Sequence, residues 1–141
     1  MSDPLHHECG IAFVRLKKDL GYYLQRYGTC LWGFQRLYLL MEKQHNRGQD
    51  GVGIGCVKLN MPLGQPYLFR ERSADRDSLI GVMEDQLRNL RKLERKEKLD
   101  PQDPESFKAN FDFGGEVLLG HLRYGTSGTF GSGGCHPYVR R

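Results

Sequence analysis

The chain has 141 residues, of which 38% are hydrophobic and 27% are charged, and its formal net charge is +4. This length suits a single domain, and no segment approaches the ~20 consecutive apolar residues of a membrane-spanning helix. The modest positive charge gives no strong compositional support for nucleic-acid binding. Residues 1–8 have neither the basic nor the apolar region of a secretion signal, so we expect a cytoplasmic protein with reduced thiols.

The first half of the chain predicts three strands and one helix. Residues 9–16 form a short apolar strand that begins at a cysteine, and residues 31–44 carry apolar side chains at helical spacing. Residues 51–59 alternate small and apolar side chains, and residues 65–73 do so less regularly, so both are predicted strands. Residues 60–64 would join these two strands as a hairpin.

The second half predicts a long charged helix and a central strand. Within residues 77–105, one helix face is marked by Ile80, Met83, Leu87 and Leu90. The rest of this helix is dense in Lys, Arg and Glu, which is most often a solvated face, although contact with RNA is an alternative. Proline cannot continue a helix, so the Asp-Pro-Gln-Asp-Pro stretch should end it. A strongly apolar stretch follows, which should form a central strand that runs into a glycine-rich loop.

Cys9 is the first candidate catalytic residue, because it stands where the polar leader meets the first strand. If the leader were removed, the thiol and a new α-amino group would belong to one residue. An α-amine has a pKa of about 8, so it can accept the thiol proton and return it to a leaving group. Cys9 could then act as a nucleophile without a separate histidine. The alternative interpretation is a structural cysteine.

Two arginines beside glycine-rich turns are candidates for contacts with a ligand. Arg47 precedes Gly48 at the predicted helix-to-strand corner, where a tight turn can project the guanidinium; the alternative is a simple helix cap and turn. Arg123 ends an apolar strand and can bind a carboxylate through two guanidinium nitrogens. Thr126 and Ser127 supply hydroxyls in the loop that follows. This loop lacks the Gly-Lys-Ser/Thr ending of a phosphate-binding loop, and a plain surface turn is the alternative.

A metal site is not predicted. The candidate ligands show no paired Cys-x-x-Cys or His-x-x-x-His spacing. These candidates are His6, His7, Cys9, Cys56, Cys135 and His136.

Three stretches, taken in order, resemble the class II glutamine amidotransferases, a family of N-terminal-nucleophile glutaminases. They are Cys-Gly-Ile from Cys9, Arg-Gly-Gln-Asp-Gly-x-Gly-Ile from Arg47, and Gly-His-x-Arg-Tyr-x-Thr-x-Gly from Gly120. The Arg-Gly-Gln-Asp stretch is most similar to the amidophosphoribosyltransferases of purine biosynthesis. Glucosamine-phosphate synthases usually have Tyr in place of Gln49, and asparagine synthetases usually have Pro. The similarity covers most of residues 9–128.

The resemblance implies an α+β fold of four layers (αββα), with two stacked antiparallel sheets between helices, incomplete in this chain. It implies that residues 1–8 are a propeptide or leader and that residues 9–141 are the N-terminal part of a glutaminase domain. The implied catalytic residues are Cys9, which would form a γ-glutamyl thioester with L-glutamine, and Arg47, which would support local geometry or charge. The implied substrate-binding residues are Arg123, Tyr124, Thr126 and Ser127.

The same resemblance implies where the ammonia goes. In an amidophosphoribosyltransferase it is transferred to phosphoribosyl pyrophosphate, and another acceptor, such as a sugar phosphate or 2-oxoglutarate, is the alternative. No cofactor is expected in this stretch; Mg²⁺ would belong to a phosphoribosyltransferase domain outside it, and an iron–sulfur cluster is left open. The full-length parent is expected to be a homo-oligomer that contacts neither nucleic acid nor membrane.

Some family features have no match in the 141 residues. The Asn-Gly pair of the oxyanion hole and the acidic residue that holds the substrate amino group are absent, and one oxyanion donor contributes ~3 kcal/mol to the barrier. We therefore expect the N-terminal part of a larger enzyme, inactive alone. The helix around residues 80–99 is long for the family and would be an insertion. A third hypothesis is a non-catalytic interaction module with an uncleaved leader, in which the basic helix is the partner surface.

Overall fold

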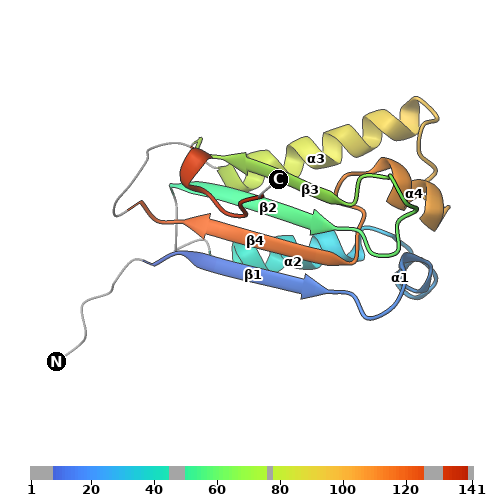
Figure 1. Ribbon diagram of the computed structural model, residues 1–141, viewed down its shortest axis with the longest axis horizontal. Helices are drawn as coiled ribbons and strands as arrows, with labels where there is room; N and C mark the ends of the chain where they lie inside the picture. The colour runs from blue at the N-terminus through green and yellow to red at the C-terminus, as the bar shows by residue number, and fades with distance from the viewer. Residues whose placement is uncertain (1–7, 45–49, 76–77, 126–131, 140–141) are drawn as a thin grey trace.

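The computed structural model describes residues 8–44, 50–75, 78–125 and 132–139 of the chain (Figure 1). Strands and helices both contribute, so the fold is α+β, as predicted. In chain order the elements are β1 (Gly10–Arg15), α1 (Leu20–Tyr27), α2 (Trp32–Glu42), β2 (Gly51–Val57), β3 (Leu68–Ser73), α3 (Ser78–Arg95), α4 (Pro104–Asn110), β4 (Val117–Arg123) and the short 3₁₀ helix η1 (Ser132–Gly134).

The four strands form one antiparallel sheet in the order β1-β4-β2-β3. β2 pairs with β3 along its length, from Val52 opposite Ser73 to Val57 opposite Leu68, which confirms the predicted hairpin. β4 lies between β1 and β2, which confirms its predicted central position. Within the described ranges the structure contains this single sheet. The predicted α+β class and one antiparallel sheet are therefore confirmed, whereas the predicted second sheet is not among the described residues.

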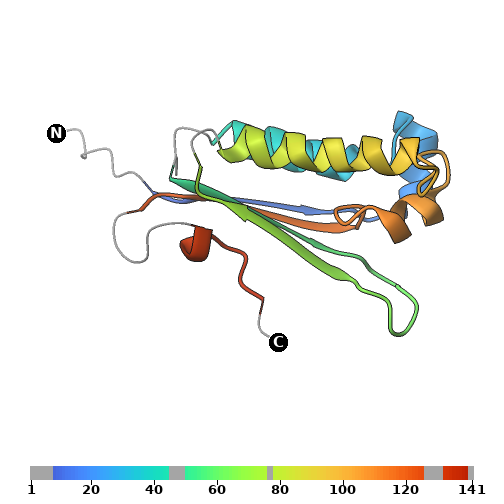
Figure 2. The same ribbon diagram turned by 90° about the horizontal axis from the view of Figure 1, so that it is seen from above.

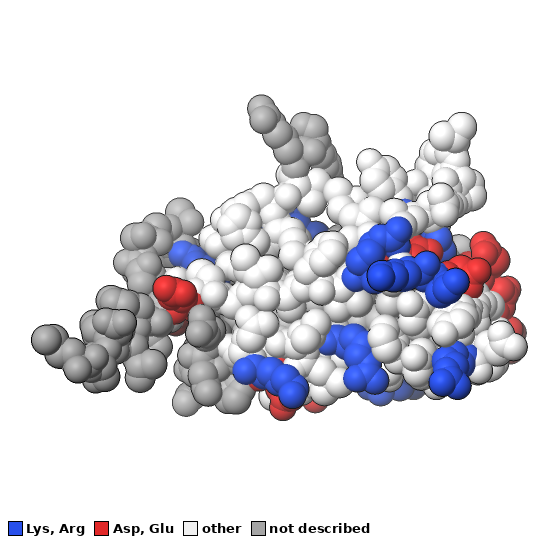
Figure 3. All heavy atoms as spheres, turned by 90° about the horizontal axis from the view of Figure 1, so that it is seen from below, with Lys and Arg blue, Asp and Glu red and all other residues white. Residues whose placement is uncertain are grey.

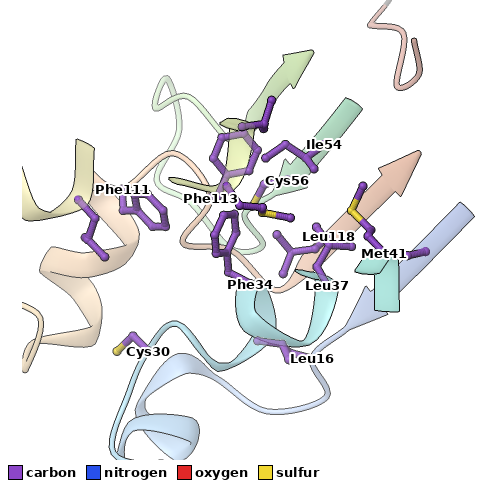
Figure 4. Packing of buried hydrophobic residues seen from close by; sticks show 14 of the residues in the cluster. Leu16, Cys30, Phe34, Leu37, Met41, Ile54, Cys56, Phe111, Phe113 and Leu118 are labelled. Atoms are coloured by element: carbon purple, nitrogen blue, oxygen red, sulfur yellow. The ribbon is translucent and has the colours of Figure 1, made fainter. Parts of the chain in front are cut away.

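Helices α2 and α3 cover one face of the sheet, and η1 with the residues after it lies on the other face (Figure 2). The hydrophobic core fills the space between the sheet and the two helices (Figure 4). Its most completely buried side chains include Leu37 and Met41 of α2, Val52 and Ile54 of β2, and Leu118 of β4. The alternating pattern of β2 therefore directs its apolar residues to the helices.

Helix α2 was predicted from its apolar spacing, whereas α1 and α4 were not predicted. Both of the missed helices begin with an aspartate cap. The Asp19 carboxylate accepts the Tyr22 N–H (2.8 Å between O and N), and α1 ends at Gly28, whose φ is +78°. Asp103 caps α4, and Pro104 occupies its first turn, where a missing N–H costs no hydrogen bond.

Helix α3 confirms the predicted charged helix, with two corrections. It ends at Arg95, before the proline stretch, because Glu97 adopts a left-handed φ of +54° and the Lys98 N–H donates to the Leu93 carbonyl. This is the geometry of a Schellman cap, so a local turn and not proline ends the helix. Ile80, which its spacing placed on the buried face, is 53% exposed.

A buried group of charges joins α4 to the end of β2 and to the start of β4. Lys108 Nζ lies 2.6 Å from Glu116 Oε1, and Glu116 Oε2 accepts the Leu59 N–H at 2.9 Å. Lys58 Nζ donates to the Lys108 carbonyl at 2.6 Å, and burial lowers the pKa of Lys58. Because each of these charges has a partner, the group fixes α4 against the sheet at the cost of desolvating several ions.

The surface charge is distributed in separate groups on the face shown in Figure 3, where several Lys and Arg side chains lie beside Asp or Glu. None of the helices that the structure describes has the length and apolarity needed to cross a membrane.

Candidate functional site

Three strand ends meet where the candidate residues lie: the start of β1, the end of β4 and the start of β2. Gly10 pairs with Leu122, so one further step in the register places Cys9 beside Arg123. Arg123 in turn pairs with Gly51 on its other side. Directly opposed residues share a face, so Cys9, Arg123 and Gly51 form a row on the face turned away from α2 and α3.

The Cys9 thiol is held by the backbone of Tyr124. The Tyr124 N–H donates to Cys9 Sγ at 3.4 Å between N and S, and Sγ lies 3.9 Å from the Tyr124 carbonyl oxygen. The predicted nucleophile therefore sits at a strand end, exposed, with a hydrogen-bond donor in place.

The other three cysteines, all of them in described parts of the chain, are buried. Burial, followed by the charge of Asp103, raises the pKa of Cys30 to about 11, and burial raises the pKa of Cys56 to about 12. Burial also raises the pKa of Cys135, against the opposing effect of Arg123 and Arg72. Thiols that are buried and protonated are poor nucleophiles, so Cys9 is the cysteine placed for reaction with a solute.

The Arg123 guanidinium lies against the segment that follows the glycine-rich loop. Its side chain lies close enough to Cys135 to lower the pKa of that thiol. A Cβ on Gly134 would lie 2.1 Å from Arg123 Nη1, so a residue with a side chain cannot occupy position 134 without displacing the guanidinium. Arg123 is itself buried, and its position is thus set by residues far along the chain.

Asp50 joins the start of β2 to the turn after β4. Its backbone N–H donates to the Arg123 carbonyl at 2.9 Å, and its Oδ2 accepts the Gly125 N–H at 2.8 Å. These two bonds fix the backbone on both sides of Tyr124, which holds the Cys9 thiol. Asp50 was not predicted as a site residue, although it lies within the Arg-Gly-Gln-Asp motif.

Three glycines of β2, here called the glycine track, contact the segment after η1, which is Cys135–Pro137. They are Gly51, Gly53 and Gly55. A Cβ on Gly51 would lie 2.5 Å from Cys135 Sγ, and one on Gly55 would lie 2.7 Å from Pro137 Cγ. At Gly53 the same atom would lie 1.5 Å from the His136 carbonyl oxygen. The segment therefore rests directly on the β2 backbone, and this close approach explains why small residues alternate in the sequence of β2.

The segment is held in place by His121 and Arg72, neither of which was predicted. His121 Nδ1 accepts the His136 N–H at 3.1 Å. Arg72 Nη1 donates to the Cys135 carbonyl at 3.2 Å, and its guanidinium lies 5.7 Å from the ring centre of Tyr138. His121 belongs to the Gly-His-x-Arg motif and Arg72 to no motif, but neither pattern reveals this role, because the sheet register places both residues opposite Gly53.

Stability should fall in mild acid through His121. Burial, followed by the charges of His136 and Arg123, lowers the pKa of His121. The unfolded chain, with a histidine pKa of about 6.5, then binds more protons than the folded one as pH falls below that value. The contribution of His121 to the free energy of unfolding should therefore be fully present above about pH 6.5 and should decline below it. The reason is that a protonated Nδ1 cannot accept the His136 N–H.

Urea unfolding at about pH 7.5 and about pH 5.5 measures this decline. His121→Asn retains an acceptor oxygen but does not titrate, so it should flatten the dependence. His136→Ala keeps the backbone donor and should preserve most of it. If the wild type and His121→Asn lost the same free energy of unfolding between these two pH values, His121 would not be the titrating group.

The structure thus brings together three of the predicted site residues, Cys9, Arg123 and Tyr124. Arg47, Thr126 and Ser127 lie outside the described residues. The described part of the chain holds no group of three or more His, Cys, Asp or Glu side chains placed to bind a metal ion.

Comparison of the chain with protein-family models, with curated proteins and with solved structures finds no match in any of the three.

Proposed function

We propose that this chain is part of a glutamine amidotransferase and releases ammonia from L-glutamine with Cys9 as the nucleophile. The observation that carries the proposal is the row across β1 and β4. An exposed thiol that accepts a backbone N–H stands there beside a buried arginine on the same face. A nucleophile next to a carboxylate-binding group is the arrangement needed to hold and attack an amino-acid side chain.

The reaction requires cleavage of the Glu8–Cys9 peptide bond, which frees the Cys9 α-amine. The amine takes the thiol proton while Sγ bonds to the side-chain amide carbon of glutamine. It then gives that proton to the amide nitrogen, the C–N bond breaks and ammonia leaves. Water, deprotonated by the same amine, attacks the thioester; the C–S bond breaks, and glutamate and the free thiol are restored.

The exposed side of the sheet supports the proposed four-layer fold. Ile11 is 66% exposed and Phe13 is 60% exposed, and both point away from the helices. Apolar side chains on a sheet face are normally covered by another layer. In the proposed αββα arrangement a second antiparallel sheet, with its own helices, covers this face. Residues 9–141 would then be the N-terminal part of the domain and residues 1–8 its propeptide.

The proposed acceptor of the ammonia is phosphoribosyl pyrophosphate, in purine biosynthesis in the cytoplasm. This choice rests on the Arg-Gly-Gln-Asp sequence, in which Gln49 differs from the residue usual in the sugar-phosphate branch. Arg47, Thr126 and Ser127 keep the roles that the resemblance implies. The acceptor site, and any Mg²⁺ bound there, would belong to a separate phosphoribosyltransferase domain.

Replacement of Arg123 with alanine should raise the KM for glutamine by about tenfold or more in the enzyme that contains this chain, with a smaller change in kcat. The guanidinium is expected to bind the substrate α-carboxylate, and a charge-assisted bidentate pair contributes strongly to ground-state binding. Steady-state glutaminase assays measure both constants. Arg123→Lys keeps the charge but cannot form two parallel hydrogen bonds to a carboxylate. Its KM should lie between those of the wild type and Arg123→Ala. An unchanged KM in Arg123→Ala would exclude the carboxylate contact.

The proposal is tested by the intact mass of the enzyme that contains this chain, before and after exposure to diazo-oxo-norleucine. The diazo-bearing carbon should take up the thiol proton and bond to the Cys9 sulfur as N₂ leaves. A chain that starts at Cys9 should therefore gain the mass of one reagent molecule less N₂. The buried cysteines should stay unmodified. A chain that retains residues 1–8 and gains no adduct would contradict the glutaminase assignment, and the non-catalytic interaction module would replace it.

A further inference from the structure

A groove of about 460 Å³ runs between α2 and α3 on the outer side of the helix layer, away from Cys9. Most of its lining is apolar, and the polar side chains lie at its rim. The apolar lining residues are Phe34, Tyr38, Leu39, Ile80, Met83 and Leu87.

The groove leaves large apolar side chains in contact with water. Ile80 is 53% exposed and Leu39 is 40% exposed, although each belongs to a helix that buries other apolar residues against the sheet. Helix α2 also exposes Leu40, so its apolar surface extends well beyond the stripe that packs on the sheet. A helix that is apolar on most of its circumference is normally covered on more than one side.

The rim of the groove carries one charge of each sign. Arg36 lies on the α2 wall and Glu84 on the α3 wall. Helix α2 ends, and α3 begins, at the end of the sheet where β2 starts, so the helices run antiparallel. Arg36 lies six residues before the end of α2 at Glu42, and Glu84 lies six residues after the start of α3 at Ser78. The two side chains therefore stand at about the same level of the groove, on opposite sides. Neither forms an ion pair within the described residues, and the Arg36 guanidinium lies over the Trp32 ring, 5.0 Å from its centre.

We propose that this groove is the interface between two copies of the chain, related by a two-fold axis that runs along the groove. Such an axis lays α2 of each copy over α3 of the other. Arg36 then faces the partner's Glu84, and Glu84 faces the partner's Arg36. Leu39 and Ile80 are enclosed between the two ion pairs. A surface with both charges at one level matches itself under this rotation, whereas a uniformly charged partner would meet one repulsive wall.

Sedimentation equilibrium of the purified chain tests the interface by charge exchange. The wild type should reach the mass of a dimer at tens of micromolar protein. Arg36→Glu alone and Glu84→Arg alone each place like charges together at two symmetric sites, so each should weaken dimerisation by about tenfold or more. The double variant Arg36→Glu with Glu84→Arg restores opposite charges at both sites and should recover the dimer.

Two apolar variants distinguish this face from the sheet face. Ile80→Glu, in the groove, should give a monomer with an unchanged far-UV circular-dichroism spectrum and a lower melting temperature, because dimerisation no longer stabilises the fold. Ile11→Glu, on the opposite side of the molecule, should leave the dimer intact. The proposal is overturned by a wild-type monomer, by a double variant that stays monomeric, or by dimer loss in Ile11→Glu only. Labelling of Cys9 does not involve this face, so failure here leaves the proposed function unaffected.

Discussion

Replacing Cys9 with alanine should abolish glutamine hydrolysis in the enzyme that contains this chain, with a fall in kcat on the order of 10⁴-fold or more. Removal of a covalent nucleophile takes away the whole thioester route and leaves only binding and polarisation of the amide. The Cys9→Ala variant should also lose its adduct with diazo-oxo-norleucine. Because the Cys9 side chain is exposed and, among the described residues, hydrogen-bonds the Tyr124 backbone, folding should be unaffected.

Two controls separate chemistry from structure. Cys9→Ser keeps the size and the hydrogen bond to Tyr124 but has a far less acidic group, so it should bind glutamine with little turnover. Cys30→Ala removes a buried thiol outside the site and should retain kcat, with some loss of stability. Steady-state rates, together with the thermal melting point of each variant, give the comparison. Full turnover by Cys9→Ala would mean that the nucleophile is another group.

Gly53→Ala is expected to lower the free energy of unfolding by about 3 kcal/mol or more. The added methyl would lie 1.5 Å from the His136 carbonyl oxygen, a separation that no pair of non-bonded atoms keeps. Since that oxygen belongs to backbone and the His136 N–H is bonded to His121, the clash cannot be relieved by a side-chain rotation. Either the segment lifts from the sheet or β2 distorts, and both lose buried contacts.

Gly81→Ala is the matched control for this substitution. Gly81 lies in α3 with no atom within 4 Å of an added Cβ. Alanine there should raise the free energy of unfolding by about 0.5–1 kcal/mol, because glycine is the poorer helix former. Urea denaturation of both variants measures the two opposite effects. A Gly53→Ala protein as stable as the wild type would show that the segment does not rest on β2 in solution.

The sequence predicted the elements whose pattern is local. The alternation in β2 and the helical spacing of Phe34, Tyr38 and Met41 each identify one face of one element, and each was confirmed. The register could not be predicted, because pairings such as Gly10 with Leu122 join residues far apart in the chain. Helices α1 and α4 are short and carry little apolar periodicity, so their aspartate caps were the available signals.

Some residues of the candidate site could be predicted from local sequence, and others could not. Cys9 and Arg123 could be selected from their positions at strand ends, next to glycine-rich stretches. The roles of Asp50 and Cys135 depend on contacts across the sheet that no spacing reveals. Ile80 shows a further limit: its spacing identifies an apolar stripe but not whether this chain covers it. Covering depends on what packs against the helix, which the period of one helix does not encode.

The glycine track has a consequence for how the protein is made. Glycine favours neither strand geometry nor side-chain packing, so β2 has little intrinsic preference for its place inside the sheet. Its cover, Cys135–Pro137, emerges from the ribosome only after nearly all the other described residues. Until then the nascent chain presents a strip of bare backbone on the same sheet face as exposed Ile11 and Phe13. This surface would attract chaperones and neighbouring chains, and production should depend on how quickly synthesis passes residue 137.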